Sequence, residues 1–193
     1  MSFKDIVSRI FLNVFSSSEL LFGYLFLISA IVFQNVYSLY VFIALILKSF
    51  ILAYPKKLFK NSILGKRPLG AFDCNMFSCG GKPKHGGLIS GHMTNVVMAT
   101  VLILLTLRAE GEYNSNLVWL LSFIIITTGI SRYLTKCHTL FQISLGVIVG
   151  TIFGYTLFIV QKIIERENDR FKEDKKKFYS IFKCINSKDE KDA

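Results

Sequence analysis

Charged residues are missing from long stretches of this chain. Residues 20–47 contain none, and hydrophobic residues, 18 phenylalanines among them, make up much of the 193 positions. A soluble domain of this length cannot bury so much apolar surface, so the composition excludes an ordinary soluble globular fold. It predicts one small membrane domain whose surroundings are the lipid bilayer.

Residues that bind metal ions are also scarce. The three histidines and four cysteines do not combine into the paired close spacing of a zinc site, and no aspartate cluster offers itself for Mg²⁺. We therefore expect no metal and no other cofactor. Cys74 and Cys79 are close enough in sequence to form a disulfide in an oxidising compartment, and free thiols throughout are the equal alternative.

Positive charge is concentrated outside the apolar runs. The net charge is +10, a value that often indicates a nucleic-acid partner. Here the basic residues lie between the apolar runs or near the C-terminus. Phosphorylated lipid or an anionic membrane surface explains this distribution more directly, so we expect no nucleic-acid partner.

The apolar runs predict an all-helical transmembrane bundle of about five spans. The charge-free run is too long for one span, and Gln34-Asn35 is a plausible turn between two. Lys48 lies in the second span, but we expect its ammonium to reach the interface, as long lysine side chains commonly do. The predicted elements are an interfacial helix over residues 1–15 and spans over 17–33, 36–54, 90–108, 116–131 and 139–161.

The chain divides into residues 1–162, the predicted membrane-embedded domain, and residues 163–193, a charged C-terminal tail. Ile164, Phe171 and Phe178 recur every seven residues in the tail, but two heptads are too few to predict a coiled coil. We expect the tail to be a solvated helical stalk that continues out of the membrane.

Glycines at four-residue spacing mark the last predicted span. Gly146, Gly150 and Gly154 would let a neighbouring helix approach closely. Packing inside the bundle is the first expectation for this stripe, and a homo-oligomer contact through the same three residues is the alternative.

Two polar intervals interrupt the apolar runs, at residues 60–92 and 131–142. Counting five spans places both on one side of the membrane and the tail on the other. The first interval holds one acid, Asp73, and the second holds none, while both are rich in lysine, arginine and histidine. Arginine and lysine can surround a phosphate, and histidines can act as nucleophile and proton donor, so the pattern favours metal-free phosphoryl transfer.

Three short motifs fall inside these intervals. The first joins Lys60 to Arg67-Pro68, the second is Ser90-Gly91-His92, and the third runs from Ser131-Arg132 to His138 and on to Gln142. In order and spacing they resemble the three motifs of the type 2 phosphatidic acid phosphatases, membrane relatives of the vanadium haloperoxidases. The resemblance implies a lipid phosphate phosphatase whose site faces away from the cytosol, with a cytosolic tail.

The resemblance also implies a role for each matched residue. His138 would attack phosphorus to give a phosphohistidine, and His92 would protonate the leaving oxygen. No metal is needed in this scheme, and the substrate would be phosphatidate or a related lipid mono- or diphosphate. The residues expected to bind the phosphate oxygens are Lys60, Arg67, Ser90, the Gly91 backbone and Arg132.

Two positions depart from the family pattern. The proline before Ser-Gly-His is Ile89, which removes no chemical group, and the aspartate expected four residues after His138 is Gln142. On a helix Gln142 can reach His138 and accept a hydrogen bond, but it carries no charge to stabilise an imidazolium. The sequence therefore also allows a weak or inactive homologue that binds lipid phosphates, and a lipid phosphotransferase.

Overall fold

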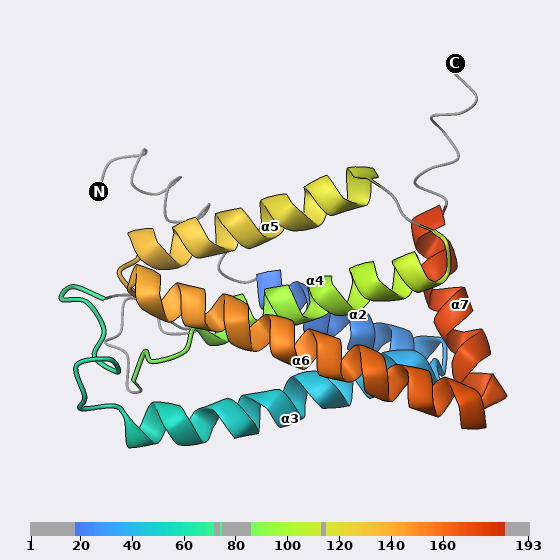
Figure 1. Cartoon of the computed structure of the whole chain (residues 1–193), viewed down its shortest axis with the longest axis horizontal. Coiled ribbons are helices and arrows are strands. Elements are labelled where there is room, and N and C mark those ends of the chain that lie inside the picture. The colour runs from blue at the N-terminus through green and yellow to red at the C-terminus, as the bar shows by residue number, and fades with distance from the viewer. Residues whose placement is uncertain (1–17, 72–73, 75–85, 113–114, 184–193) are drawn as a thin grey trace, which may run out of the picture.

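The computed structural model describes residues 18–71, 74, 86–112 and 115–183, and in these ranges the chain is helical and has no strand. The predicted all-helical fold is confirmed (Figure 1). The interfacial helix expected over residues 1–15 lies outside the described residues. The helices are α2 (Ser18–Val32), α3 (Val36–Leu58), α4 (Gly91–Ala109), α5 (Ser115–Leu134), α6 (Leu140–Glu167) and α7 (Asp169–Lys183).

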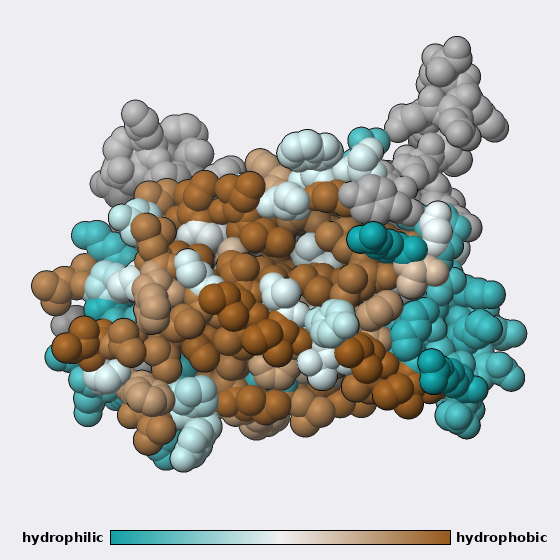
Figure 2. Space-filling model, in the orientation of Figure 1, coloured by the Kyte–Doolittle hydropathy of each residue, from teal (hydrophilic) through white to brown (hydrophobic). Residues whose placement is uncertain are grey.

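In the part of the chain that the structure describes, α3, α4, α5 and α6 are long and apolar enough to cross a membrane. They correspond to four of the five predicted spans. The remaining one corresponds to α2, whose 15 residues are fewer than the roughly 20 that a span needs. Apolar side chains cover the middle of the visible face and hydrophilic ones gather toward its ends (Figure 2), as expected of a membrane protein.

The central packing of the bundle joins α4 to α6. A Cβ atom built on any of the three stripe glycines would lie 2.8 or 2.9 Å from a carbonyl oxygen of α4 or of the residue before it, so only glycine permits this approach. The stripe therefore packs inside the bundle, as expected, and the homo-oligomer contact stays a prediction. The facing pairs are Gly146 with Ser90, Gly150 with Thr94 and Gly154 with Met98.

The tail does not form a solvated stalk. After α6, the chain turns at Asn168 and α7 crosses the end of the bundle (Figure 1). Phe171 and Phe178 are buried in the main core, where both rings contact Tyr37 of α3. The heptad spacing of the two phenylalanines therefore reflects one buried face that packs against the same chain.

Polar groups of α7 are also buried at this end. Lys175, 1% exposed, forms ion pairs with Glu110 at 2.5 Å and Glu165 at 2.7 Å. Asp174 accepts a hydrogen bond from the backbone N–H of Val36 at 2.9 Å, where α3 begins and its first N–H groups lack helical partners. α7 thus packs against the bundle through its apolar side chains and also through buried ion pairs and hydrogen bonds.

Lys48 corrects a second expectation. Its side chain is 2% exposed and does not reach the interface, because its ammonium donates a hydrogen bond to Asn95 of α4. A charged group inside a membrane span needs such a polar partner. The sequence favoured the interface because Lys48 lies only a few residues from the end of the predicted span 36–54. In the structure, α4 packs close enough for Asn95 to bind the ammonium inside the bundle.

The α4–α6 contact predicts a matched pair of glycine variants. Gly150→Ala should lower the free energy of unfolding by about 1–3 kcal/mol, because its Cβ would lie 2.8 Å from the Thr94 carbonyl oxygen. Gly23→Ala in α2 should change stability by less than about 1 kcal/mol, since nothing lies within 4 Å of its Cβ position and alanine favours helix. Unfolding in detergent micelles measures both, and equal effects would contradict the packing described.

Candidate active site

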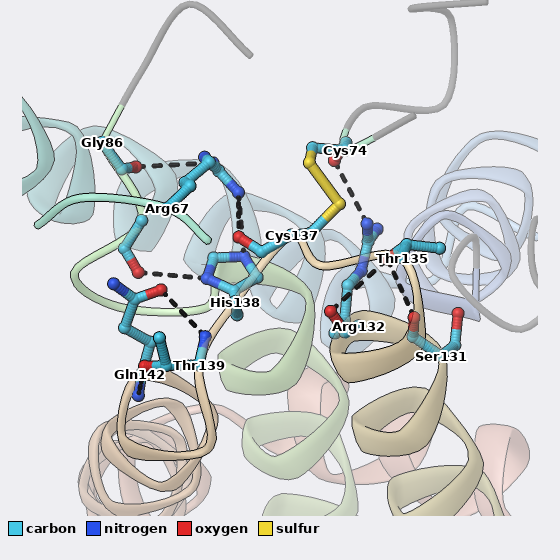
Figure 3. Close-up of a disulfide and its surroundings, with 11 residues drawn as sticks. Arg67, Cys74, Gly86, Ser131, Arg132, Thr135, Cys137, His138, Thr139 and Gln142 are labelled. Carbon is cyan, nitrogen blue, oxygen red and sulfur yellow. Dashed lines mark hydrogen bonds between the residues drawn. A yellow bond between two sulfur atoms is a disulfide. The ribbon is translucent and has the colours of Figure 1, made fainter. Parts of the chain in front are cut away.

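The matched motif residues meet at the end of the bundle opposite α7. This end is built from the segment after α3, the start of α4 and the turn between α5 and α6 (Figures 1 and 3). The described parts of the two polar intervals therefore lie at one end of the bundle, as the sequence predicted, and α7 lies at the other.

His138 is held in one orientation by the backbone. It lies in the turn before α6, is 4% exposed, and its Nδ1 is 3.0 Å from the carbonyl oxygen of Gly87 (Figure 3). Because a carbonyl can only accept, Nδ1 carries the proton and Nε2 keeps its lone pair. Burial, followed by the charges of Arg67 and Arg132, lowers the pKa of His138 to about 3, and the Gly87 hydrogen bond opposes the shift. At neutral pH the imidazole is therefore uncharged, and its orientation is fixed by the Gly87 hydrogen bond.

Arg67 lies against the lone pair of this histidine. Its Nη1 donates to the carbonyl oxygen of Cys137 at 2.7 Å and is 3.4 Å from His138 Nε2, while Nη2 donates to the Gly86 carbonyl at 3.4 Å. Burial lowers the pKa of Arg67 to about 10, so the guanidinium stays charged at neutral pH. The position fits a cation that binds a phosphate in contact with His138.

Arg132 is the second cation beside His138. It is 1% exposed, and its Nη1 donates to the carbonyl oxygen of Cys74 at 3.2 Å (Figure 3). Cys74 is joined by a disulfide to Cys137, which directly precedes the histidine. The disulfide therefore ties together two segments whose carbonyl groups hold the two arginines.

For Cys74, the disulfide agrees with neither alternative that the sequence left open, a bridge to Cys79 or a free thiol. Cys74 bonds to Cys137, 63 residues away, so it cannot bond to Cys79, which lies outside the described residues. Cys79 is near Cys74 along the chain, but in the folded structure Cys74 lies beside Cys137, in the turn after α5. The position of Cys137 next to His138 was the one sequence signal that could have indicated this pairing.

Gln142 does not orient His138. Its Nε2 donates to the carbonyl oxygens of Leu64 at 2.8 Å and Lys66 at 2.9 Å, and its Oε1 accepts from the Thr139 N–H at 3.3 Å. Together with the Thr139 side chain it forms the capping box that begins α6. In this structure the Gly87 carbonyl, and not Gln142, is hydrogen-bonded to His138 Nδ1, and Gln142 ties the Arg67 loop to α6.

The second motif supplies the start of α4. Ser90 precedes the helix; its Oγ is buried and has no hydrogen-bond partner among the described residues. Buried hydroxyl groups are rarely left without a partner, so this one is suited to a ligand. His92, in the first turn, lies close enough to His138 and Arg132 to interact with them electrostatically. Helix N-termini favour anions, which adds to the positive character of this site.

Lys60, the lysine of the first motif, is not the lysine that lies nearest to Gly91 in this structure. Lys60 is exposed, and its Cα packs near Gly86. Lys56, one helical turn earlier on α3, lies with its Nζ 2.9 Å from the Cβ position of Gly91 and interacts with both His92 and His138. The motif pattern does not include Lys56, and its place four residues before Lys60 was the available sequence signal.

The assembled side chains form a site for an anion. Two arginines and a lysine act on the neutral His138, and an unpartnered serine hydroxyl and a second histidine lie at the start of the neighbouring helix. Within the described ranges, no three His, Cys, Asp or Glu side chains lie close enough together to hold a metal ion. The arrangement can bind a tetrahedral phosphate, attack it and protonate a leaving oxygen.

The hydrogen bonds of Gln142 predict that restoring the family aspartate is harmful. Gln142→Asp and the isosteric Gln142→Glu both remove the donor that binds the Leu64 and Lys66 carbonyls. Each should lower the free energy of unfolding by about 1–3 kcal/mol and reduce phosphate binding. Unfolding in detergent and vanadate binding measure these effects. Gain of either property in Gln142→Asp would show that Gln142 replaces an orienting aspartate after all.

Comparison with known proteins agrees with this geometry. The family model of the PAP2 superfamily matches residues 37–165, which run from the start of α3 to near the end of α6 and include every matched motif residue. Searches of curated proteins and of solved structures found no match. Since the family model covers more than half of the chain, this membrane protein belongs to the PAP2 superfamily, whose members are phosphatases.

Proposed function

We propose that the protein is a metal-independent lipid phosphate phosphatase that works through a phosphohistidine. One observation carries the proposal: His138 is buried, its Nδ1 is bound to the Gly87 carbonyl, and its Nε2 is 3.4 Å from the Arg67 guanidinium. A histidine held in this tautomer beside a cation has a free-electron-pair nitrogen with which it can attack a bound phosphate.

The reaction would proceed in two steps. Nε2 of His138 attacks phosphorus while the bond to the leaving oxygen breaks, and His92 gives that oxygen a proton. Water then attacks the phosphohistidine, His92 takes the proton of that water, and inorganic phosphate leaves. Arg67, Arg132 and the Ser90 hydroxyl neutralise and orient the phosphate oxygens, with the Gly91 N–H at the start of α4.

The surroundings favour a lipid as substrate. The site lies at the end of helices whose exposed side chains are mainly apolar, so a phosphate bound there belongs to a molecule at the membrane interface. The position of Gln142 also bears on activity. Because the Gly87 carbonyl orients His138, the missing aspartate does not by itself make the chain a silent binder.

The disulfide supports an orientation in the membrane. Disulfides persist in oxidising compartments and are rare in the cytosol. Cys74–Cys137 lies at the site, so we place the active site on the non-cytosolic face. The tail, at the opposite end of the bundle, is then cytosolic.

The proposed activity predicts metal-free phosphate release. The native protein in detergent micelles with EDTA should release phosphate from phosphatidate or a prenyl diphosphate. His138→Asn keeps a donor toward Gly87 and removes the nucleophile, so it should reduce turnover by a factor on the order of 10³ or more. Lys57→Met, which changes an exposed residue of α3, is the matched control and should keep native activity.

Three outcomes decide between the alternatives. An acid-labile phosphoenzyme that is absent from His138→Asn would support the phosphohistidine. Phosphate binding without release would identify a lipid-phosphate binder. A new phosphorylated lipid formed when an acceptor alcohol is added would identify a phosphotransferase, and either of these last two results would overturn the proposed hydrolysis.

The proposed orientation predicts which end of the bundle an impermeant maleimide reaches in intact cells. With Cys79 and Cys184 replaced by serine, Ile63→Cys at the site end should be labelled, since Ile63 is 91% exposed. Lys176→Cys on the exposed face of α7 should be labelled only after permeabilisation. The reverse pattern would place the active site in the cytosol.

A further inference from the structure

Each arginine of the candidate site is hydrogen-bonded to a cysteine of the other polar interval. Arg67 and Cys74 belong to the loop after α3, whereas Arg132 and Cys137 belong to the end of α5 and the turn that follows it. Arg67 Nη1 donates to the Cys137 carbonyl oxygen at 2.7 Å, and Arg132 Nη1 donates to the Cys74 carbonyl oxygen at 3.2 Å (Figure 3). Because the two hydrogen bonds cross between the segments, the position of each guanidinium depends on the position of the opposite segment.

The Cys74–Cys137 disulfide fixes the relative position of the two segments covalently. It joins residues that are 63 positions apart in the chain, and their Cα atoms are 5.3 Å apart. Both cysteines are buried, and Cys137 directly precedes His138. The bond therefore holds the two acceptor carbonyls, and with them the two arginines, beside the proposed nucleophile.

The charges at the site oppose this closeness. Arg67 and Arg132 both act electrostatically on His138, so the two guanidinium groups lie near one another. Like charges in a partly buried place repel each other, which favours separation of the two segments when no anion is bound. The disulfide opposes that separation and keeps both cations beside His138.

Reduction of the disulfide should loosen the site without unfolding the protein. Gln142 binds the carbonyl oxygens of Leu64 and Lys66, so the first part of the loop stays attached to α6. The α4–α6 contact and the main apolar core are formed by other residues than Cys74 and Cys137. Reduction thus removes the fixed position of one segment relative to the other and leaves the bundle that carries them.

We propose that the Cys74–Cys137 disulfide is a redox control on phosphate binding at this site. This inference rests on the proposed function, and it adds that the enzyme is competent only when this pair is oxidised. In the oxidation, the two thiols lose two protons and two electrons as the S–S bond forms, and a disulfide oxidant accepts them and becomes two thiols. Because the cytosol keeps thiols reduced, the chain gains its affinity for phosphate only after the site has reached an oxidising compartment.

The test compares the binding of inorganic phosphate by the oxidised and the reduced protein. With Cys79 and Cys184 replaced by serine, the full chain in detergent micelles should show no thiol that reacts with maleimide, even after unfolding. After reduction with a dithiol that is then removed, two thiols should react. The dissociation constant for phosphate should rise by about tenfold or more, the effect of losing one contact to a charged group. Oxidised glutathione should restore both values.

Substitutions separate this effect from a general loss of stability. Cys74→Ser, Cys137→Ser and the double replacement should raise the dissociation constant to the same value, because each removes the same bond, and none should respond to the dithiol. Phe178→Leu, in the core at the opposite end of the bundle, is the matched control. It should lower the unfolding temperature and leave the phosphate affinity unchanged, in titrations carried out below the unfolding temperature of every variant.

The other outcomes contradict the inference in different ways. Two reactive thiols in the protein as isolated would show that the pair is not oxidised. An unchanged dissociation constant in the folded, reduced protein would show that phosphate binding does not depend on the bond, and this result stands even if the serine variants fail to fold. A rise of the same size in Phe178→Leu would show that lower stability alone explains the effect.

The same titrations separate this inference from the proposed function. Redox-dependent phosphate binding by a protein that releases no phosphate from lipid phosphates would overturn the proposed hydrolysis and support the control of binding. No phosphate binding by the oxidised protein would overturn both.

Discussion

The contact of α4 with α6 is the constraint on which the rest of the structure depends. Three glycines let the two helix backbones approach until side-chain carbons would collide with carbonyl oxygens. At the site end of the same contact, the Ser90 N–H donates to the Gln142 carbonyl at 3.2 Å. This approach brings the start of α4, with Ser90 and His92, beside the turn that carries His138. The packing of α4 against α6 therefore also positions the residues of the candidate site at one end of the same interface.

The loop after α3 completes the site by satisfying buried backbone groups. Gln142 binds the carbonyls of Leu64 and Lys66, Arg67 binds those of Gly86 and Cys137, and Arg132 binds that of Cys74. Each side chain thus positions a segment that contributes to the site. Unpaired carbonyls in such an enclosed place would be costly, so the loop and the site stabilise one another.

At the opposite end of the bundle, α7 packs against the other helices through aromatic rings and ion pairs. There α7 buries aromatic rings against Tyr37 and pairs Lys175 with two glutamates of different helices. The Tyr37 and Tyr179 hydroxyls also lie 2.7 Å apart. Burial raises the pKa of Tyr179 to about 12, so its hydroxyl remains protonated and able to donate. The packing of α7 fixes the ends of α3, α4 and α6 relative to each other, far from the reacting groups.

The sequence by itself determined the helical membrane fold, the shared side of both basic intervals and the identity of the three motifs, because hydropathy and spacing are local properties. Only the tertiary structure decided which groups meet. The partner of Cys74, the Gly87 carbonyl on His138, the ties made by Gln142, the burial of Lys48 and the approach of Lys56 all join segments far apart in the chain. Such contacts depend on how backbones pack, which no local pattern of residues records.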